Sequence, residues 1–309
     1  MIQLSIVSTL YKSENFLNEF YERLTLVCKK LKLKDYEIIF VNDGSDDSSL
    51  DIAIKLMERD SKLKIIDLSR NFGHHKAIIT GLKYAQGEDV FLIDSDLEEQ
   101  PEWLLEFYNF RNNNNCDVVY GVQEKRTRGF LDLFFGNLFY YLFNFITDLN
   151  LPKNLVIARL MTKRYVSSFV LHCEREVSIA GLFLITGYKQ LPFIVKKQYK
   201  KTTTYTFSKK IELFINSITS FSDRPLVFIF YIGMIISVIS FGYILYLILM
   251  KLLFMKPLMG WTSIMASIWF IGGIIISFIG IIGIYIAKIF SETKQRPNTI
   301  VRKIYSKNN

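Results

Sequence analysis

Two long uncharged stretches near the C-terminal end constrain this chain most. Residues 226–250 and 264–287 contain no Asp, Glu, Lys or Arg, and each exceeds the roughly 20 apolar residues that a helix needs to cross a bilayer. Two buried core helices are the alternative, but such helices carry a polar face and these stretches have none. The connection 251–263 is short and contains Pro257 and Gly260. We therefore expect a hairpin of two transmembrane helices.

Charge indicates the orientation of this hairpin. The formal net charge is +9, and it lies mostly outside the hairpin, whose connecting loop carries only Lys251 and Lys256. Because basic residues accumulate on the cytoplasmic side of a membrane, residues 1–207 and a basic tail, 288–309, are expected in the cytoplasm together with both termini. The apolar run after Met1 is short and lacks a basic start, so we expect no cleavable signal peptide.

The N-terminal part alternates runs of β-forming residues with helical patterns. This alternation predicts an α/β domain with a mostly parallel, Rossmann-like sheet and right-handed crossovers. No G-x-G-x-x-G follows the first strand and no G-x-x-x-x-G-K-S/T is present, which disfavours dinucleotide oxidoreductases and P-loop NTPases. The expected strands are 3–9, 36–41, 63–68 and 90–93.

Two carboxylates follow the last of these strands. Asp94 and Asp96 come directly after 90–93, at the carboxyl end where open α/β sheets bind their ligands. Carboxylates held this close repel each other unless a cation lies between them, and Mg²⁺ or Mn²⁺ that also binds a substrate's phosphates fits this requirement. The alternative is an acidic loop that caps the helix beginning near Pro101. His74 and His75 could also bind a metal, but adjacent histidines after a glycine more often start a helix.

Three motifs carry a resemblance to a known family. In their order and spacing, they look like the nucleotide-sugar glycosyltransferases of family 2, which have the GT-A fold. The best fit is to the polyprenyl-phosphate glycosyltransferases, the group of dolichol-phosphate mannose synthase and the bacterial undecaprenyl-phosphate sugar transferases. The motifs are VNDGSDD at 41–47, RNFGHHKA at 70–77 and DSDLEEQPE at 94–102, and the match continues through FGNLFYYLFN at 135–144, ARLM at 158–161, SFSDRPL at 220–226 and SETKQRP at 291–297.

The resemblance implies roles for the acidic residues. Asp43 would bind the base or ribose of the donor, with Glu14 nearby. Asp94 and Asp96 would be catalytic by holding the metal and the donor's diphosphate. Glu98 stands where dolichol-phosphate mannose synthase has a glutamine in the metal shell, and it could still ligate through oxygen.

The acceptor would need cations to hold its phosphate, but no buried general base, because a phosphate monoester is largely a dianion at pH 7. Arg126 is the best candidate for this catalytic clamp, together with Arg128. Lys200 and Lys201, in a lysine run beside the membrane, and Thr203 are further candidates.

Two apolar segments with helical spacing are expected at the membrane surface. Residues 130–146 are rich in aromatic side chains and would form an interfacial helix that admits the lipid tail, with an ordinary core helix as the alternative. Residues 208–225 form a second amphipathic segment directly before the first membrane span.

The chain departs from the family pattern near the expected sugar and acceptor sites. Many relatives carry an acidic residue just before the position of Arg159, and none of residues 155–158 is acidic. Where relatives show R-x-x-G-x-S-K-Y, this chain reads QYKKTTTY from Gln198, and Gln123 stands where an arginine is common. These changes suggest altered specificity.

The expected function is metal-dependent, inverting transfer of one sugar from a UDP- or GDP-sugar to polyprenyl (undecaprenyl) phosphate, in synthesis or modification of cell-envelope glycans such as O-antigen. The protein would be a multi-pass protein of the bacterial inner membrane. Alternatives are transfer to a lipid-linked glycan, for which Glu174 or Glu176 could be the base, and a catalytically silent nucleotide-sugar-binding subunit. The lipid bilayer is an expected partner, a small membrane flippase and a second copy of the chain are further candidates, and the anchor argues against nucleic acid.

Overall fold

The structure is a computed structural model that describes residues 2–124, 141–147, 149–150, 152–172, 174, 179–197, 215–216, 218–254 and 260–307. The chain forms two compact units. The first consists of Met1–Tyr141, Leu149–Thr206 and Arg296–Asn309, and the second of Leu142–Asp148 and Phe207–Gln295.

An eight-stranded sheet forms the centre of the first unit, in the order β7-β5-β6-β4-β1-β2-β3-β8. The strands β4, β1, β2 and β3 are parallel to one another, as the alternating sequence pattern predicts. Strand β6 joins antiparallel to β4 and β5, and β8 joins antiparallel to β3. The strands are β1 (Leu4–Leu10), β2 (Tyr36–Asn42), β3 (Leu63–Leu68), β4 (Asp89–Leu92), β5 (Val118–Gln123), β6 (Leu155–Thr162), β7 (Gln190–Val195) and β8 (Val301–Tyr305).

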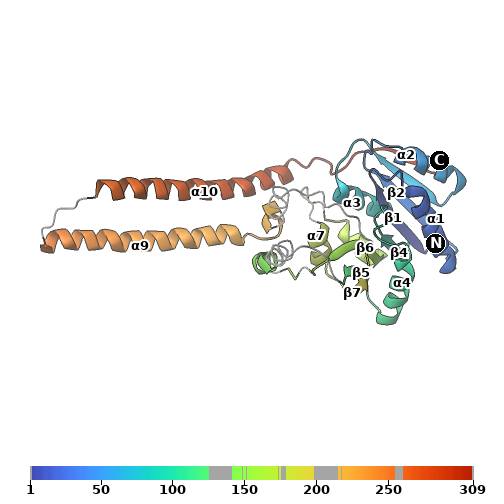
Figure 1. The fold of residues 1–309 in the computed structure, drawn as a ribbon, viewed down its shortest axis with the longest axis horizontal. Coiled ribbons are helices and arrows are strands. Elements are labelled where there is room, and N and C mark those ends of the chain that lie inside the picture. The colour runs from blue at the N-terminus through green and yellow to red at the C-terminus, as the bar shows by residue number, and fades with distance from the viewer. Residues whose placement is uncertain are drawn as a thin grey trace. The chain divides into compact units, whose positions relative to one another are not determined.

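Helices cover both faces of this sheet (Figure 1). Successive residues of a strand point to opposite faces, and in β1 Ile6 packs in the core formed with α1, α2 and α4, whereas Val7 lies against Gly81 of α3. Because both faces are covered, every residue of β1 is buried. The helices of this unit are α1 (Leu17–Lys30), α2 (Ser49–Arg59), α3 (His74–Tyr84), α4 (Trp103–Asn114), α6 (Lys163–Phe169) and α7 (Ile179–Ile185).

The C-terminal segment is part of the sheet. The sequence suggested only a basic tail over 288–309, but β8 pairs with β3 as an edge strand. Arg302 Nε lies 2.7 Å from Oδ2 of the buried Asp67, and the hydroxyl groups of Thr299 and Thr80 are 2.8 Å apart. Strand β8 is short and charged, so its sequence alone does not indicate a strand. It forms because the folded domain provides the open edge of β3 with which it pairs.

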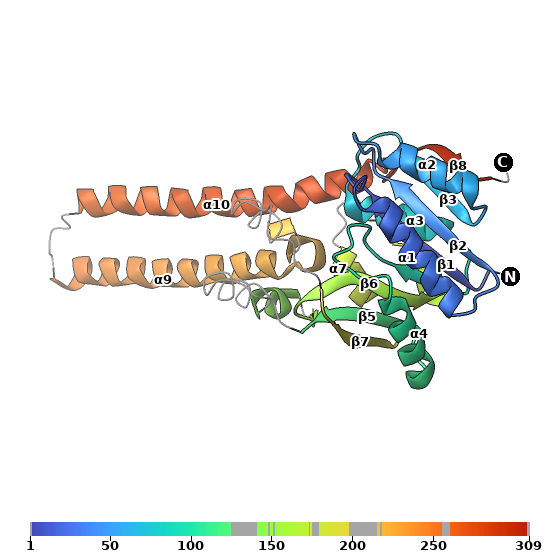
Figure 2. The same ribbon diagram turned by 45° about the vertical axis from the view of Figure 1, so that its right-hand side comes forward.

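The second unit contains the two long apolar helices, which lie side by side (Figure 2). They are α9 (Arg224–Phe254) and α10 (Trp261–Thr293), and they contain the expected spans 226–250 and 264–287. Each includes a stretch long and apolar enough to cross a membrane, and none of that stretch is buried within the described part of the protein. Such exposure of large apolar side chains agrees with a lipid environment.

Only parts of the two expected interfacial segments lie within the described residues. Residues 141–147 are helical, as are 218–221. They are held together at the base of the hairpin, where Ser222 Oγ donates to the Ile146 carbonyl at 2.6 Å and Tyr285 donates to the Ser222 carbonyl at 2.8 Å. The remainder of 130–146 and of 208–217 lies mostly outside the described residues.

Gly44, in the loop after β2, gives a first testable prediction. Its φ is +59°, and an added Cβ would lie 2.4 Å from backbone atoms of Arg70 and Asn71. Gly187 is a matched control, because its φ is +77° but a Cβ would meet nothing within 4 Å. Gly187→Ala should therefore cost about 1–2 kcal/mol of unfolding free energy from backbone strain alone, and Gly44→Ala should cost clearly more.

The check is the thermal unfolding midpoint of both variants in the same detergent. Equal losses for the two variants would contradict the close approach of Gly44 to the segment at Arg70.

Candidate active site

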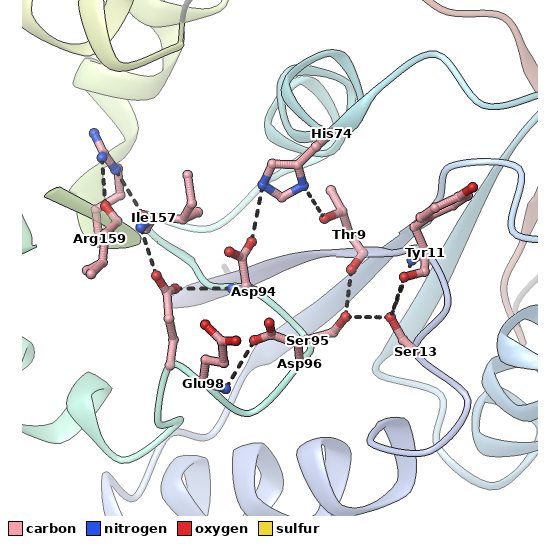
Figure 3. A network of polar contacts seen from close by, with 12 residues as sticks. Thr9, Tyr11, Ser13, His74, Asp94, Ser95, Asp96, Glu98, Ile157 and Arg159 are labelled. Atoms are coloured by element: carbon pink, nitrogen blue, oxygen red, sulfur yellow. Dashed lines mark hydrogen bonds and ion pairs between the residues drawn. The ribbon is translucent and has the colours of Figure 1, made fainter. Parts of the chain in front are cut away.

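The acidic turn, residues 94–99 after β4, is fixed to the end of β1 (Figure 3). The Ile93 amide still donates to the Val7 carbonyl at 3.1 Å, so the chain leaves the sheet at Asp94. The hydroxyl group of Ser95 donates to the Thr9 carbonyl at 2.8 Å and lies 2.9 Å from the hydroxyl of Ser13. The prediction that Asp94 and Asp96 follow a buried strand at its carboxyl end is confirmed.

His74 contacts Asp94 from the start of α3. Its Nε2 lies 3.3 Å from Asp94 Oδ1, and its Nδ1 lies 3.1 Å from Thr9 Oγ1. Burial lowers the pKa of His74, while the charges of Asp43 and Asp96 oppose that shift. A neutral ring that donates to Asp94 would accept from Thr9. The histidine therefore starts a helix, as expected, and also orients Asp94, which the sequence did not indicate.

Glu99 is a functional candidate that sequence reasoning missed. It is fully buried, and its two oxygens accept hydrogen bonds from the amides of Ile157, at 2.8 Å, and Asp94, at 3.3 Å. Burial and the nearby Asp94 raise the pKa of Glu99 to about 8. The β4–β6 register pairs Leu92 with Arg159, which brings Ile157 beside the acidic turn. Glu99 thus brings a carboxyl group to the stretch before Arg159 that has no acid of its own.

Burial and the charge of Asp96 raise the pKa of Asp94 to about 7. Burial is the larger cause, and a bound cation would offset both the burial and the repulsion between Asp94 and Asp96. Asp96 Oδ1 accepts from the Glu98 amide at 3.0 Å, and Leu97 between them has a φ of 61°. Glu98 turns its own carboxylate to Lys197, with Oε2 at 2.8 Å from Nζ.

A divalent ion fits this turn only in part. Within the described residues, no three His, Cys, Asp or Glu side chains are grouped to hold a metal ion by themselves. Mg²⁺, however, is usually bound by one or two carboxylates with water and substrate phosphates as the other ligands. Asp94 and Asp96 can supply two such oxygen ligands, whereas Glu98 is engaged by Lys197 in this structure.

A cavity of about 210 Å³ opens beside the acidic turn. Arg159 on its wall is almost completely buried, donates to the carbonyls of Val156 and Ile157, and stacks on Phe183 with Cζ 3.3 Å from the ring centroid. Burial lowers the pKa of Arg159 to about 10. The cavity therefore presents both carboxyl groups and cations to a ligand, and it is lined by His75, Asp94, Glu99, Leu155, Val156, Ile157, Arg159, Ile179, Ala180 and Lys197.

The expected donor-binding residues Asp43 and Glu14 make local contacts with loops. The oxygens of the buried Asp43 accept from the amides of Phe72, at 2.7 Å, and Gly73, at 3.0 Å. Glu14 Oε2 accepts from the Ser48 amide at 3.1 Å. Both carboxylates thus fix loops at the carboxyl ends of the parallel strands. Their roles in donor binding stay predictions.

Several predicted residues lie outside the described part of the chain. They are Arg126 and Arg128 of the expected clamp, with Lys200, Lys201 and Thr203. Their roles therefore also stay predictions. Glu176 is likewise not described, whereas the Glu174 carbonyl accepts from Asn298 at 3.1 Å.

Asp43→Asn tests the loop contacts. An asparagine has one acceptor oxygen, so its amino group would face a backbone donor and one of the two hydrogen bonds would be lost. We expect a loss of about 1–3 kcal/mol in the free energy of unfolding, typical of a buried unsatisfied donor. Amide exchange should also accelerate at residues 70–76.

The control is Asp46→Asn in the same loop after β2, because Asp46 is exposed and its ion pair among the described residues is with the exposed Lys12. If Asp43→Asn were as stable as the control in the absence of nucleotide, the loop-fixing role of Asp43 would be wrong.

Comparison with known proteins agrees with this architecture. Residues 5–163 match the model of glycosyl transferase family 2. A Mycobacterium tuberculosis protein described as a glycosyltransferase is 48% identical over 304 residues, covering 98% of this chain and 89% of that protein. The prophage bactoprenol glucosyl transferase homolog of Escherichia coli is 30% identical over 306 residues, covering 98% and 99%.

Among solved structures, S. aureus TarS 1-349 in complex with UDP-GlcNAc matches with 18% identity and a TM-score of 0.46, over 71% of this chain and 66% of that one. The family model matches about half of this chain, and full-length relatives extend the similarity over almost all of it. The chain therefore belongs to glycosyltransferase family 2 and is a glycosyltransferase with a GT-A-like α/β fold.

Proposed function

We propose that the protein transfers a sugar from a UDP- or GDP-sugar to polyprenyl phosphate, with inversion at the sugar and with Mg²⁺ or Mn²⁺. The observation that carries the proposal is the acidic turn at Asp94 and Asp96 beside a cavity, in a chain that also has two helices of membrane-spanning length. Relatives named as bactoprenol glucosyl transferases support this acceptor, because the similarity to them covers 98–99% of the chain.

The reaction forms a bond between an acceptor phosphate oxygen and the anomeric carbon of the sugar. It breaks the bond from that carbon to the diphosphate, which leaves with the electron pair. The acceptor needs no base, because its second pKa near 6 leaves much of it as a dianion at pH 7. When bound, a divalent ion would neutralise the leaving diphosphate.

The residues of the acidic turn would have distinct tasks in this reaction. Asp94 and Asp96 would hold the ion, while His74 and the Glu99 carboxyl group fix the side chain and the amide of Asp94. Arg126, with Arg128, Lys200, Lys201 and Thr203, is proposed to hold the acceptor phosphate.

Transfer of radiolabelled sugar into a chloroform-soluble product tests the proposal. Membranes containing the protein, undecaprenyl phosphate and Mn²⁺ should label the lipid from one member of a panel of UDP- and GDP-sugars. Asp96→Ala should lower the rate by about 100-fold or more, the usual cost of losing a group that stabilises developing charge. Asp35→Ala, an exposed carboxylate before β2, is the control and should keep wild-type transfer.

Two results would contradict the proposal. Full activity of Asp96→Ala would remove the acidic turn from catalysis. If no donor labels the lipid although nucleotide binds, the polyprenyl phosphate acceptor is wrong, and a lipid-linked glycan is the next acceptor to test.

We further propose that α9 and α10 span the bacterial inner membrane, with the first unit and both termini in the cytoplasm. In a background without native cysteines, Lys256→Cys should react with a membrane-impermeant maleimide on spheroplasts. Lys303→Cys in β8 should react only after lysis. Labelling of Lys303→Cys on intact spheroplasts would reverse the orientation.

A further inference from the structure

Lys197 lies among the carboxylates of the acidic turn. It follows β7 by two residues, and its ammonium group is 2.8 Å from Glu98 Oε2. It also lines the cavity together with Asp94 and Glu99. About a quarter of each side chain of the Lys197–Glu98 pair is exposed, 26% and 24%, so the pair is partly shielded from water and stronger than a surface ion pair.

Lys197 contacts one carboxylate and lies in the same cavity as two other carboxyl groups. Burial opposes its charge, but the contact with Glu98 and the nearby Glu99 and Asp94 raise the pKa of Lys197 overall. Two other basic groups near the acidic turn are differently engaged. His74 contacts Asp94, and burial lowers its pKa, whereas Arg159 on the cavity wall donates to backbone carbonyls. Within the described residues, Lys197 therefore supplies the ammonium group that balances the acidic turn.

The position of Lys197 affects the binding of a cation in two ways. The ion pair engages the Glu98 carboxylate, which is two residues from Asp96 and could otherwise add a third oxygen ligand. The ammonium group also repels a second cation that approaches Asp94 and Asp96. A donor diphosphate would reverse this balance, because its negative charges attract both the divalent ion and Lys197.

We propose that Lys197 is a positioning residue that withholds Glu98 from the metal and lowers the metal affinity of the donor-free protein, so that the divalent ion and the nucleotide diphosphate bind together. The inference rests on the proposed function and adds that the binding of the divalent ion and the binding of the nucleotide are coupled. Its structural basis is the ion pair between Lys197 and Glu98.

The test measures Mn²⁺ binding by electron paramagnetic resonance, which detects free Mn²⁺ and needs no turnover. Purified full-length protein in detergent is titrated alone and with UDP or GDP. The variants are Lys197→Met, Glu98→Gln and the double variant. Lys196→Met is the matched control, since Lys196 is the adjacent lysine but is exposed. Unfolding midpoints establish that each variant is folded.

Lys197→Met should bind Mn²⁺ alone about tenfold more tightly than wild type, because a repelling charge is lost and a carboxylate is released. Nucleotide should then increase its Mn²⁺ affinity less than it does in wild type. The double variant should fall back towards wild type, and Lys196→Met should not differ from it. Glu98→Gln alone leaves the ammonium group unpaired and should weaken Mn²⁺ binding, which provides a second reading if Lys197→Met does not fold.

Unchanged or weaker Mn²⁺ binding in a folded Lys197→Met would overturn the proposal. So would equal tightening in the single and the double variant, because Lys197 would then not act through Glu98. These results leave the proposed function intact if wild type binds Mn²⁺ with nucleotide. Absence of Mn²⁺ binding by wild type with either nucleotide would instead contradict the metal-dependent function itself, and this inference with it.

Discussion

The repulsion between carboxylates gathered after β4 is the constraint on which the site depends. Four acidic side chains occur within six residues of sequence, and burial makes their charge more costly. The structure offsets this cost with groups from three other elements. His74 comes from α3, the Ile157 amide from β6 and Lys197 from the segment after β7. The acidic turn is therefore stabilised by groups that β6 and β7 bring to it when they join the sheet.

In the loop after β2, a buried carboxylate is likewise stabilised by backbone amides from another segment. Asp43 is buried at the end of β2, and two backbone amides at the start of α3 satisfy it. Gly73 directly precedes α3, so a carboxylate that accepts from its amide stabilises the start of that helix as well. The position of His74, and through it the orientation of Asp94, thus depends on a loop contact that involves no ligand. A donor-binding role for Asp43 would add to this structural one.

Sequence patterns predicted the architecture closely where the signal is local. The strand before Asp94, the alternation of strands and helices and the two long apolar helices are confirmed, because burial on both faces and long apolar runs are visible in the sequence pattern alone. The sequence pattern did not indicate that the basic tail contains a strand. Strand β8 is short and rich in charge, and the edge of β3 that it pairs with is created only by folding. Glu99 and Lys197 were missed as partners for a related reason, since their contacts span long sequence separations.

The sequence by itself indicated the family, through the order and spacing of several short motifs. It also determined the acidic turn at the end of a buried strand and the two long apolar helices, because each of these is encoded within one contiguous stretch. Only the tertiary structure decided which groups meet that turn. The carboxyl group that contacts the backbone before Arg159 comes from Glu99, and the ammonium group that binds Glu98 comes from Lys197. Strand order and register bring these residues together, and pairing between distant strands is fixed by packing of the whole sheet and not by local sequence.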